Sequence, residues 1–182
     1  MNYSFTVTLQ KWYINHKRPL PWRDTSNPYL IWLSEIILQQ TRVSQGLPYY
    51  ERFVMHFPTI TDLANASEDE ILRLWQGLGY YSRGRNMLKC AKLVVSNYNG
   101  AFPTEIKEVK KLPGIGDYTA SAIMAIAKNK SFIGIDGNVK RVLSRIFAIQ
   151  QNKNFIKNIE KKIITMKVGK NCSDLMQCIM EI

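Results

Sequence analysis

Hydrophobic positions repeat with the period of an α-helix along almost the whole chain. Long runs of alternating apolar and polar residues are missing, as are Asn-Gly hairpins between Val- and Ile-rich stretches, so a β-sheet is not expected. The pattern therefore predicts an all-α protein of ten to eleven helices with short connectors. The expected helices cover residues 5–16, 28–42, 47–56, 60–66, 68–78, 83–97, 105–112, 118–127, 137–148, 155–166 and 172–181.

Several helix starts are marked by residues that cap free backbone amides. Asn27 before Pro28 is typical of an N-cap followed by proline in the first turn. A Thr-x-x-Asp spacing begins at Thr59 and a Ser-x-x-Glu spacing at Ser67, and both fit a capping box. These signals predict helices that begin at residues 28, 60 and 68.

The composition indicates a globular chain in a reducing compartment. The 182 residues, 46% of them hydrophobic, form one domain or two small ones and can bury about 70% of the unfolded surface. Three cysteines are too few for a disulfide scaffold. No run is long enough for a membrane span and no secretory signal is expected, so the sequence favours the cytoplasm.

Positive charge is concentrated in the second half of the chain. The chain has 25 Lys and Arg residues against 14 Asp and Glu residues, a formal charge of +11. Residues 1–91 carry 10 against 7, and residues 92–182 carry 15 against 7. Two interpretations remain open from charge alone: a solvated lysine-rich surface, or a patch that binds nucleic acid.

The segment PYLIWLSEIILQQTR, from Pro28, is apolar on nearly every side and predicts a buried central helix. Glu35 lies in its middle. A buried carboxylate is costly unless it is paired or protonated. Glu35 therefore either pairs with an arginine or caps another helix, or it is a desolvated acid that holds a proton near neutral pH and can donate it.

The segment LPGIG, residues 112–116, separates a lysine-rich helix from a helix of small residues. Gly114 and Gly116 allow positive φ and close backbone approach. The amides at the start of the next helix point outward and suit a phosphate group. An ordinary helical turn is the alternative, but the flanking lysines favour a helix–hairpin–helix that holds a DNA backbone. The candidate contacts are Leu112, Gly114, Gly116, Lys107, Lys110 and Lys111.

Asp136, in GIDGNVKRVLSRIF, is expected to cap the helix that follows it. One carboxylate oxygen can cap while the other faces a substrate. A protonated Glu35 and an ionised Asp136 in one DNA-facing cleft would suit cleavage of a glycosidic bond: the acid protonates the leaving group, and the carboxylate stabilises the cationic sugar.

Four motifs in this order, SEIILQQTRV, WQGLGYYSRGRN, LPGIGDYTASAI and DGNVKRVLSR, resemble the A/G-specific adenine DNA glycosylases (MutY type) of the endonuclease III-like helix–hairpin–helix superfamily. The resemblance begins at PLPWRDTSNPY and covers essentially the whole chain. It implies removal of adenine mispaired with 8-oxoguanine or guanine in double-stranded DNA, by a monomer associated with the nucleoid. It also implies two helical lobes, a core over residues 28–135 and a second lobe from residues 1–27 and 136–182, with the active site in the cleft between them.

The same resemblance implies roles for individual residues. Glu35 would protonate the adenine ring, Asp136 would stabilise the sugar cation, and Tyr118 and Asn138 would support them. A flipped base leaves a gap in the stack that side chains can fill. The adenine pocket would be lined by Trp22, Arg23 and Leu38, and the stack would be entered by Gln40 and by a tyrosine of the pair Tyr80 and Tyr81.

Position 118 predicts the type of chemistry. Bifunctional relatives that resemble this hairpin have a lysine there, which forms a Schiff base with the sugar and nicks the strand. Tyr118 has no amine, so water is the expected nucleophile and a monofunctional glycosylase is predicted. Lys140 either traps the product weakly or, as its basic position favours, binds a phosphate.

Two departures from the family pattern concern the end of the chain. The family closes its catalytic domain with a 4Fe–4S cluster on Cys-x6-Cys-x2-Cys-x5-Cys, and those ligands would lie beyond Ile182. Cys90, Cys172 and Cys178 do not have that spacing and are expected to be buried thiols. The expectation is a truncated chain that lacks the cluster, and also the C-terminal domain that reads 8-oxoguanine, with a loosened final helix and weak activity.

Two other functions remain open at this stage. One is a thymine or uracil mismatch glycosylase of the same superfamily, which can share the Glu, Tyr and Asp positions. The other is a DNA-binding module with little or no catalysis. The LQQT and DGN segments favour adenine.

Overall fold

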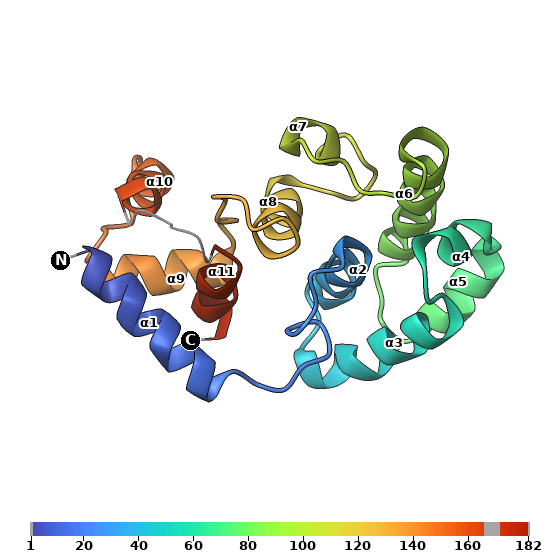
Figure 1. Ribbon diagram of the computed structural model, residues 1–182, viewed down its shortest axis with the longest axis horizontal. Coiled ribbons are helices and arrows are strands. Elements are labelled where there is room, and N and C mark those ends of the chain that lie inside the picture. The colour runs from blue at the N-terminus through green and yellow to red at the C-terminus, as the bar shows by residue number, and fades with distance from the viewer. Residues whose placement is uncertain (1, 166–171, 182) are drawn as a thin grey trace. The chain divides into compact units, whose positions relative to one another are not determined.

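The computed structural model describes residues 2–165 and 172–181. This part of the chain contains eleven helices and no strand, so the all-α prediction is confirmed (Figure 1). None of its helices is both long and apolar enough to cross a membrane. The helices are α1 Asn2–His16, α2 Pro28–Leu38, α3 Val43–His56, α4 Ile60–Asn65, α5 Glu68–Trp75, α6 Ser82–Tyr98, α7 Ile106–Val109, α8 Asp117–Ile126, α9 Gly137–Ile146, α10 Phe155–Thr165 and α11 Cys172–Glu181.

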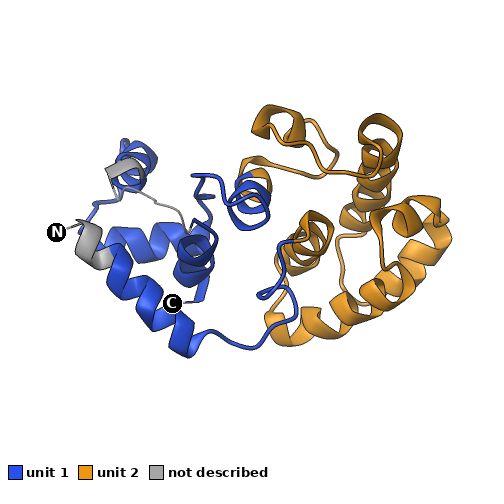
Figure 2. Ribbon diagram, in the orientation of Figure 1, with its two compact units in different colours: residues 1–26, 121–182 blue, residues 27–120 orange. Residues whose placement is uncertain are grey.

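The chain folds into two compact units (Figure 2). One unit comprises residues 27–120, and the other comprises the described residues of 1–26 and 121–182. The second boundary between the units falls inside α8, after Ala120.

The unit of residues 27–120 is built around the apolar helix α2. This helix packs against α3 and α6, and α4 and α5 pack against α6. Trp32 and Trp75 are fully buried. Phe53 meets Trp75 edge-on with ring centroids 5.8 Å apart, and Phe102 meets Trp32 at 5.4 Å. The aromatic rings thus form the centre of the core that holds α2 in place.

The other unit joins the two ends of the chain. Helix α1 packs against α11, and α9 packs against α10 and α11. The hydroxyl of Tyr13 on α1 donates to the side-chain oxygen of Gln177 on α11, 3.2 Å away. Leu143, Ile159 and Met176 are fully or almost fully buried between these helices.

The predicted helix starts are confirmed because their caps are local. Asn27 accepts a hydrogen bond from the amide of Tyr29 at 3.0 Å, and Pro28 is the first residue of α2. Thr59 and Ser67 each form a complete capping box. Each cap joins residues no more than three positions apart, so the sequence pattern contains all of its partners.

Several predicted helix ends were too late. Helix α2 ends at Leu38 rather than at residue 42, because Gln39 leaves helical geometry and Gln40 adopts a left-handed φ of 55°. Helix α5 ends at Trp75 rather than at residue 78, where Gly77 has a φ of 95°. The predicted helix at 105–112 shrinks to one turn, Ile106–Val109. Residue 166, the predicted end of α10, lies outside the described residues.

Candidate functional site

Glu35 lies on the apolar central helix, as the sequence predicted. Only 9% of the residue is exposed, and its neighbours Ile31, Trp32 and Ile36 are buried with it. The residue is thus largely withdrawn from water. Its role as a proton donor stays a prediction.

The hairpin at residues 112–116 uses its two glycines for different purposes. Gly114 has a φ of 75°, and a Cβ added there would lie 3.0 Å from the Cβ of Asn86 on α6. Gly114 is therefore required both by the turn and by close packing. Gly116 lacks the expected positive φ, and a Cβ there would meet no protein atom within 4 Å. The space beside Gly116 is open at the start of α8.

Two of the lysines predicted to contact the DNA backbone are engaged in ion pairs. Lys110 pairs with Asp117, the first residue of α8, with Nζ and Oδ1 2.7 Å apart. Lys111 pairs with Glu108 at the same distance, and this hydrogen bond raises the pKa of Lys111 and lowers that of Glu108. Both pairs are exposed, where ion pairs are weak and exchange readily with another anion.

Asp136 caps α9, as predicted. Its Oδ1 accepts from the amide of Val139 at 2.7 Å, and its Oδ2 accepts from the side-chain amide of Asn138 at 3.2 Å. The Asp-Gly-Asn segment therefore orients both carboxylate oxygens. Lys140 is half-buried one turn along the same helix.

Helix α2 and the start of α8 are linked within the unit of residues 27–120. The side-chain amide of Gln39 donates to the hydroxyl of Thr119 at 3.4 Å. Tyr118, next to Thr119, is half-buried in the first turn of α8. The helix that carries Glu35 and the hairpin helix are thus joined by a polar contact that the sequence analysis did not foresee.

Gln40 and Tyr80 share an uncommon backbone conformation. Gln40 is exposed with a φ of 55°, and Tyr80 is 66% exposed with a φ of 47°. Left-handed φ values are uncommon for residues other than glycine and cluster at functional sites. Gln40 and one of the two candidate tyrosines therefore project from tight turns.

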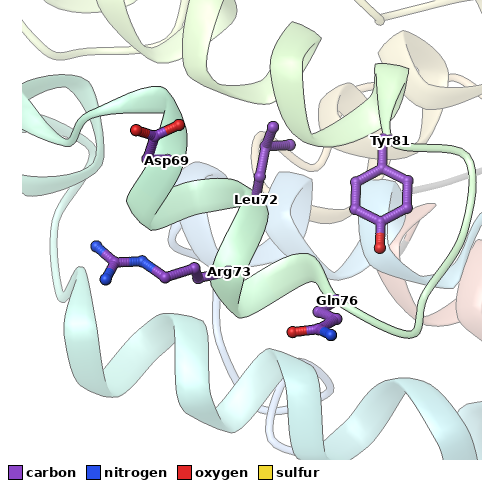
Figure 3. Close-up of a pocket in the computed structure, with 5 residues that line it drawn as sticks. All are labelled: Asp69, Leu72, Arg73, Gln76 and Tyr81. Atoms are coloured by element: carbon purple, nitrogen blue, oxygen red, sulfur yellow. The ribbon is translucent and has the colours of Figure 1, made fainter.

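Tyr81 has a different setting from Tyr80. It is the N-cap residue of α6, with helical backbone angles, and is 40% exposed. Its ring faces α5 across an open hollow of about 510 Å³ (Figure 3). The other residues of this hollow are Asp69, Leu72, Arg73 and Gln76. Tyr81 thus lacks the left-handed turn in which Tyr80 lies.

Arg83 is a candidate residue that the sequence analysis missed. Its Nη1 donates to the carbonyl oxygens of Ile36, Ile37 and Gln39 at 3.0, 3.1 and 2.5 Å. Its Nη2 donates to the carbonyl oxygens of Leu78 and Gly79 at 3.1 and 3.3 Å. In the sequence, Arg83 is only an arginine that follows a glycine-containing turn. Nothing in that local pattern identifies a hydrogen-bond partner more than forty residues away.

Trp22 and Arg23 lie in the unit that contains the chain ends, and both are buried. The guanidinium of Arg23 pairs with Glu181 at 2.6 Å and donates to the backbone and side-chain oxygens of Gln177. Arg18 also pairs with Glu181. Burial by itself raises the pKa of Glu181, but the two arginines outweigh it and the pKa is lowered. In this structure Arg23 holds the end of α11.

Leu38, the last predicted pocket residue, is half-buried where α2 meets α3. Its Cδ2 would lie 2.7 Å from a Cβ added to Gly46. Gly46 therefore allows the end of α2 to pack closely on the first turns of α3.

The described cysteines do not fit an iron–sulfur cluster. Cys90, Cys172 and Cys178 are buried and lie in no group of three potential ligands within residues 2–165 and 172–181. Burial raises the pKa of Cys90 and of Cys178 to about 12. Cluster ligands are thiolates, which such burial disfavours.

Comparison with known proteins decides the family. The pattern of the "HhH-GPD superfamily base excision DNA repair protein" matches residues 33–165. The chain belongs to this family. The match covers the second half of α2 with Glu35, the hairpin and the cap at Asp136.

Adenine DNA glycosylases are among the similar curated proteins. The one from Buchnera aphidicola subsp. Baizongia pistaciae is 45% identical over 161 residues, 88% of this chain and 46% of that protein. The one from Homo sapiens is 43% identical over 155 residues, 80% of this chain and 28% of that protein. The chain thus spans less than half the length of these relatives.

Solved structures of the superfamily share the fold. A thermostable thymine-DNA glycosylase superposes with a TM-score of 0.86 at 28% identity, over 98% of this chain and 84% of that one. An endonuclease III in a trapped covalent complex with DNA superposes with a TM-score of 0.79 at 20% identity, over 96% of this chain and 81% of that one. The second likeness shows the fold alone.

Proposed function

We propose that this chain is the catalytic part of a DNA glycosylase that hydrolyses the N-glycosidic bond of adenine mispaired with 8-oxoguanine or guanine. The observation that carries the proposal is Glu35, a buried carboxyl in the middle of an apolar helix, inside the matched family region. The partner is double-stranded DNA in the cytoplasm, at the nucleoid, and the chain acts as a monomer.

The proposed reaction uses two carboxyl groups in different protonation states. In the proposed step, Glu35 donates a proton from its carboxyl group to the adenine ring and makes the base a better leaving group. Asp136, oriented by Asn138 and the amide of Val139, stabilises the positive charge that develops on the sugar. Water then adds to the sugar carbon that the adenine has left and gives up a proton to the Glu35 carboxylate, which restores the acid. Tyr118 supports this site without forming a covalent bond.

The remaining residues hold and open the DNA. The open backbone at Gly116 and the first amides of α8 bind a phosphate, and Lys107, Lys110, Lys111 and Lys140 add positive charge. Gln40 and Tyr80 fill the gap that the flipped adenine leaves. Trp22, Arg23 and Leu38 remain the residues proposed to contact the adenine.

Single-turnover base release tests the proposed substrate. We expect release of adenine from A:8-oxoguanine and A:G duplexes, and none of thymine from T:G duplexes. The similarity to adenine DNA glycosylases supports adenine, whereas the thymine-DNA glycosylase neighbour makes thymine the alternative product. Release of thymine alone would reassign the substrate. Binding with no release of any base would indicate a DNA-binding module.

Tyr118→Lys is expected to change the reaction type. The native chain should leave little covalent complex when borohydride is added, because position 118 has no amine to form a Schiff base. The lysine variant should gain borohydride trapping and strand nicking, measured on denaturing gels. Tyr118→Phe is the matched control and should gain neither. Strong nicking by the native chain would contradict a monofunctional glycosylase.

Lys110→Ala with Lys111→Ala is expected to flatten the salt dependence of DNA binding. Each phosphate contact contributes about −0.9 to the slope of log K against log salt. Affinity should fall alike for matched and mismatched duplexes in fluorescence anisotropy titrations. Lys89→Ala with Lys92→Ala, both exposed on α6, removes the same net charge and should leave the slope nearly unchanged.

Breaking the Lys110–Asp117 ion pair from its acidic side should raise the affinity for DNA instead of lowering it. Asp117→Asn releases Lys110 and removes a negative charge beside the proposed phosphate site, so affinity should rise. A loss of affinity in the lysine variant that is confined to adenine mispairs would indicate base readout instead of backbone binding.

A further inference from the structure

Two turns that are far apart in the sequence share one hydrogen-bond donor. The turn after α2 contains Gln40, and the turn before α6 contains Tyr80, both with left-handed backbone. Arg83 donates to carbonyl oxygens in both turns. We propose that Arg83 is a positioning residue that joins the Gln40 and Tyr80 turns into one rigid unit, so that both side chains enter the base stack together. Its DNA-related part rests on the proposed function.

The end of α2 needs a donor from elsewhere. The last carbonyl groups of a helix have no partner within the helix, and the helix dipole places negative charge there. Nη1 of Arg83 supplies that donor to Ile36, Ile37 and Gln39. The helix can therefore stop at Leu38 and turn sharply at Gln40 without leaving these carbonyls unpaired.

The second terminal nitrogen of the same guanidinium donates to the turn that contains Tyr80. Nη2 reaches the carbonyls of Leu78 and Gly79, while Nε1 of Trp75 donates to Gly79 as well, at 2.9 Å. The guanidinium carbon lies 5.1 Å from the ring centre of Trp75 and 5.8 Å from that of Tyr80. One face of the Tyr80 ring is therefore held although two thirds of the residue is exposed.

The shape of the guanidinium is essential to this bridge. All five acceptors are backbone carbonyl oxygens, three on one side and two on the other. A planar fork with fixed donor directions can serve both turns at once, whereas a lysine ammonium is a single point. Burial lowers the pKa of Arg83, in agreement with a cation partly withdrawn from water. Strained left-handed residues persist only where their surroundings hold them, and Arg83 supplies that support.

The first test requires no DNA. Amide exchange followed by NMR should become at least about tenfold faster in residues 39–41 and 78–81 together when Arg83 is changed to Lys, because several charge-assisted hydrogen bonds are lost. Arg85→Lys is the matched control, since Arg85 is on the same helix and pairs only at the surface with Glu68. Faster exchange in one turn alone, or in neither, would overturn the bridge.

The second test measures coupling on DNA. A 2-aminopurine placed beside the target adenine reports opening of the stack by its fluorescence. Gln40→Ala and Tyr80→Ala alter exposed side chains and should leave the fold intact. If the two turns act as one unit, the double variant should reduce the fluorescence amplitude much less than the product of the two single-variant reductions. Multiplying effects would overturn the proposal even if Arg83→Lys failed to fold.

A third test compares the effect of Arg83→Lys in the native chain and in the variant in which Gln40 and Tyr80 are both alanine. Arg83→Lys should lower the opening amplitude about tenfold in the native background and change it little once both Gln40 and Tyr80 are alanine. Affinity for a matched duplex should stay unchanged. An equal loss in both backgrounds would indicate a general structural role. If no duplex shows opening with the native chain, the proposed glycosylase function fails, and the DNA-free exchange test still decides whether Arg83 joins the turns.

Discussion

Glu35→Gln is expected to lower the single-turnover rate of adenine release by about 10²–10⁴-fold, the usual contribution of a general acid. Glutamine keeps the shape of glutamate in the buried site but has no proton to donate. Affinity for an A:8-oxoguanine duplex should be retained, because the hairpin and the lysines that bind the backbone are unchanged. Rapid-quench assays and anisotropy titrations measure the two quantities separately.

The control for this substitution is Glu51→Gln. Glu51 is exposed on α3, so Glu51→Gln removes the same charge from the same unit and leaves the buried residues around Glu35 unchanged. The control should release adenine at the native rate. A Glu35→Gln variant within a few-fold of the native rate would remove Glu35 from the mechanism and favour its alternative role as a structural carboxyl.

Asp136→Asn is expected to reduce adenine release by about 10²–10³-fold while leaving the fold almost as stable as before. Asparagine is as good an N-cap as aspartate, so it can still accept from the amide of Val139. It lacks the negative charge that stabilises the sugar cation. The substitution therefore separates the electrostatic role of Asp136 from its structural role.

Asp136→Ala provides the comparison for stability. Loss of the cap should cost about 0.5–2 kcal/mol in the free energy of unfolding, measured by urea titration, in addition to the loss of activity. Equal activity of the Asn variant and the native chain would show that Asp136 only caps α9. Equal destabilisation by Asn and Ala would show that the cap depends on charge.

Helix starts were easier to predict from the sequence than helix ends. The starts of α2, α4, α5 and α9 were predicted correctly, whereas the predicted ends of α2 and α5 were too late. A start is marked by a cap that lies within three residues of the backbone amide from which it accepts. The end of α2 depends on Arg83, more than forty positions further along the chain, and no local pattern contains such a partner.

Charges in the candidate site show the same division. The sequence located Lys110, Lys111 and Arg23, but it could not show which acids lie beside them. The fold pairs Lys110 with Asp117 across the hairpin and places Arg23 against Glu181 at the other end of the chain. Pairing limits what these cations can do, because under the proposed function each must exchange or share its acidic partner before it can contact DNA.

By itself, the sequence determined the helical class, the burial of the helix around Glu35, the capping role of Asp136 and the family, because these depend on periodicity, local spacing and motif order. Only the tertiary structure decided where α2 stops, that Gln40 and Tyr80 are held in left-handed turns, and that Arg83 joins those turns. The physical reason is the range of the interactions. Capping and helical periodicity act over three or four residues. The carbonyl groups at a helix end and the charged side chains instead pair with whatever group the folded chain places beside them.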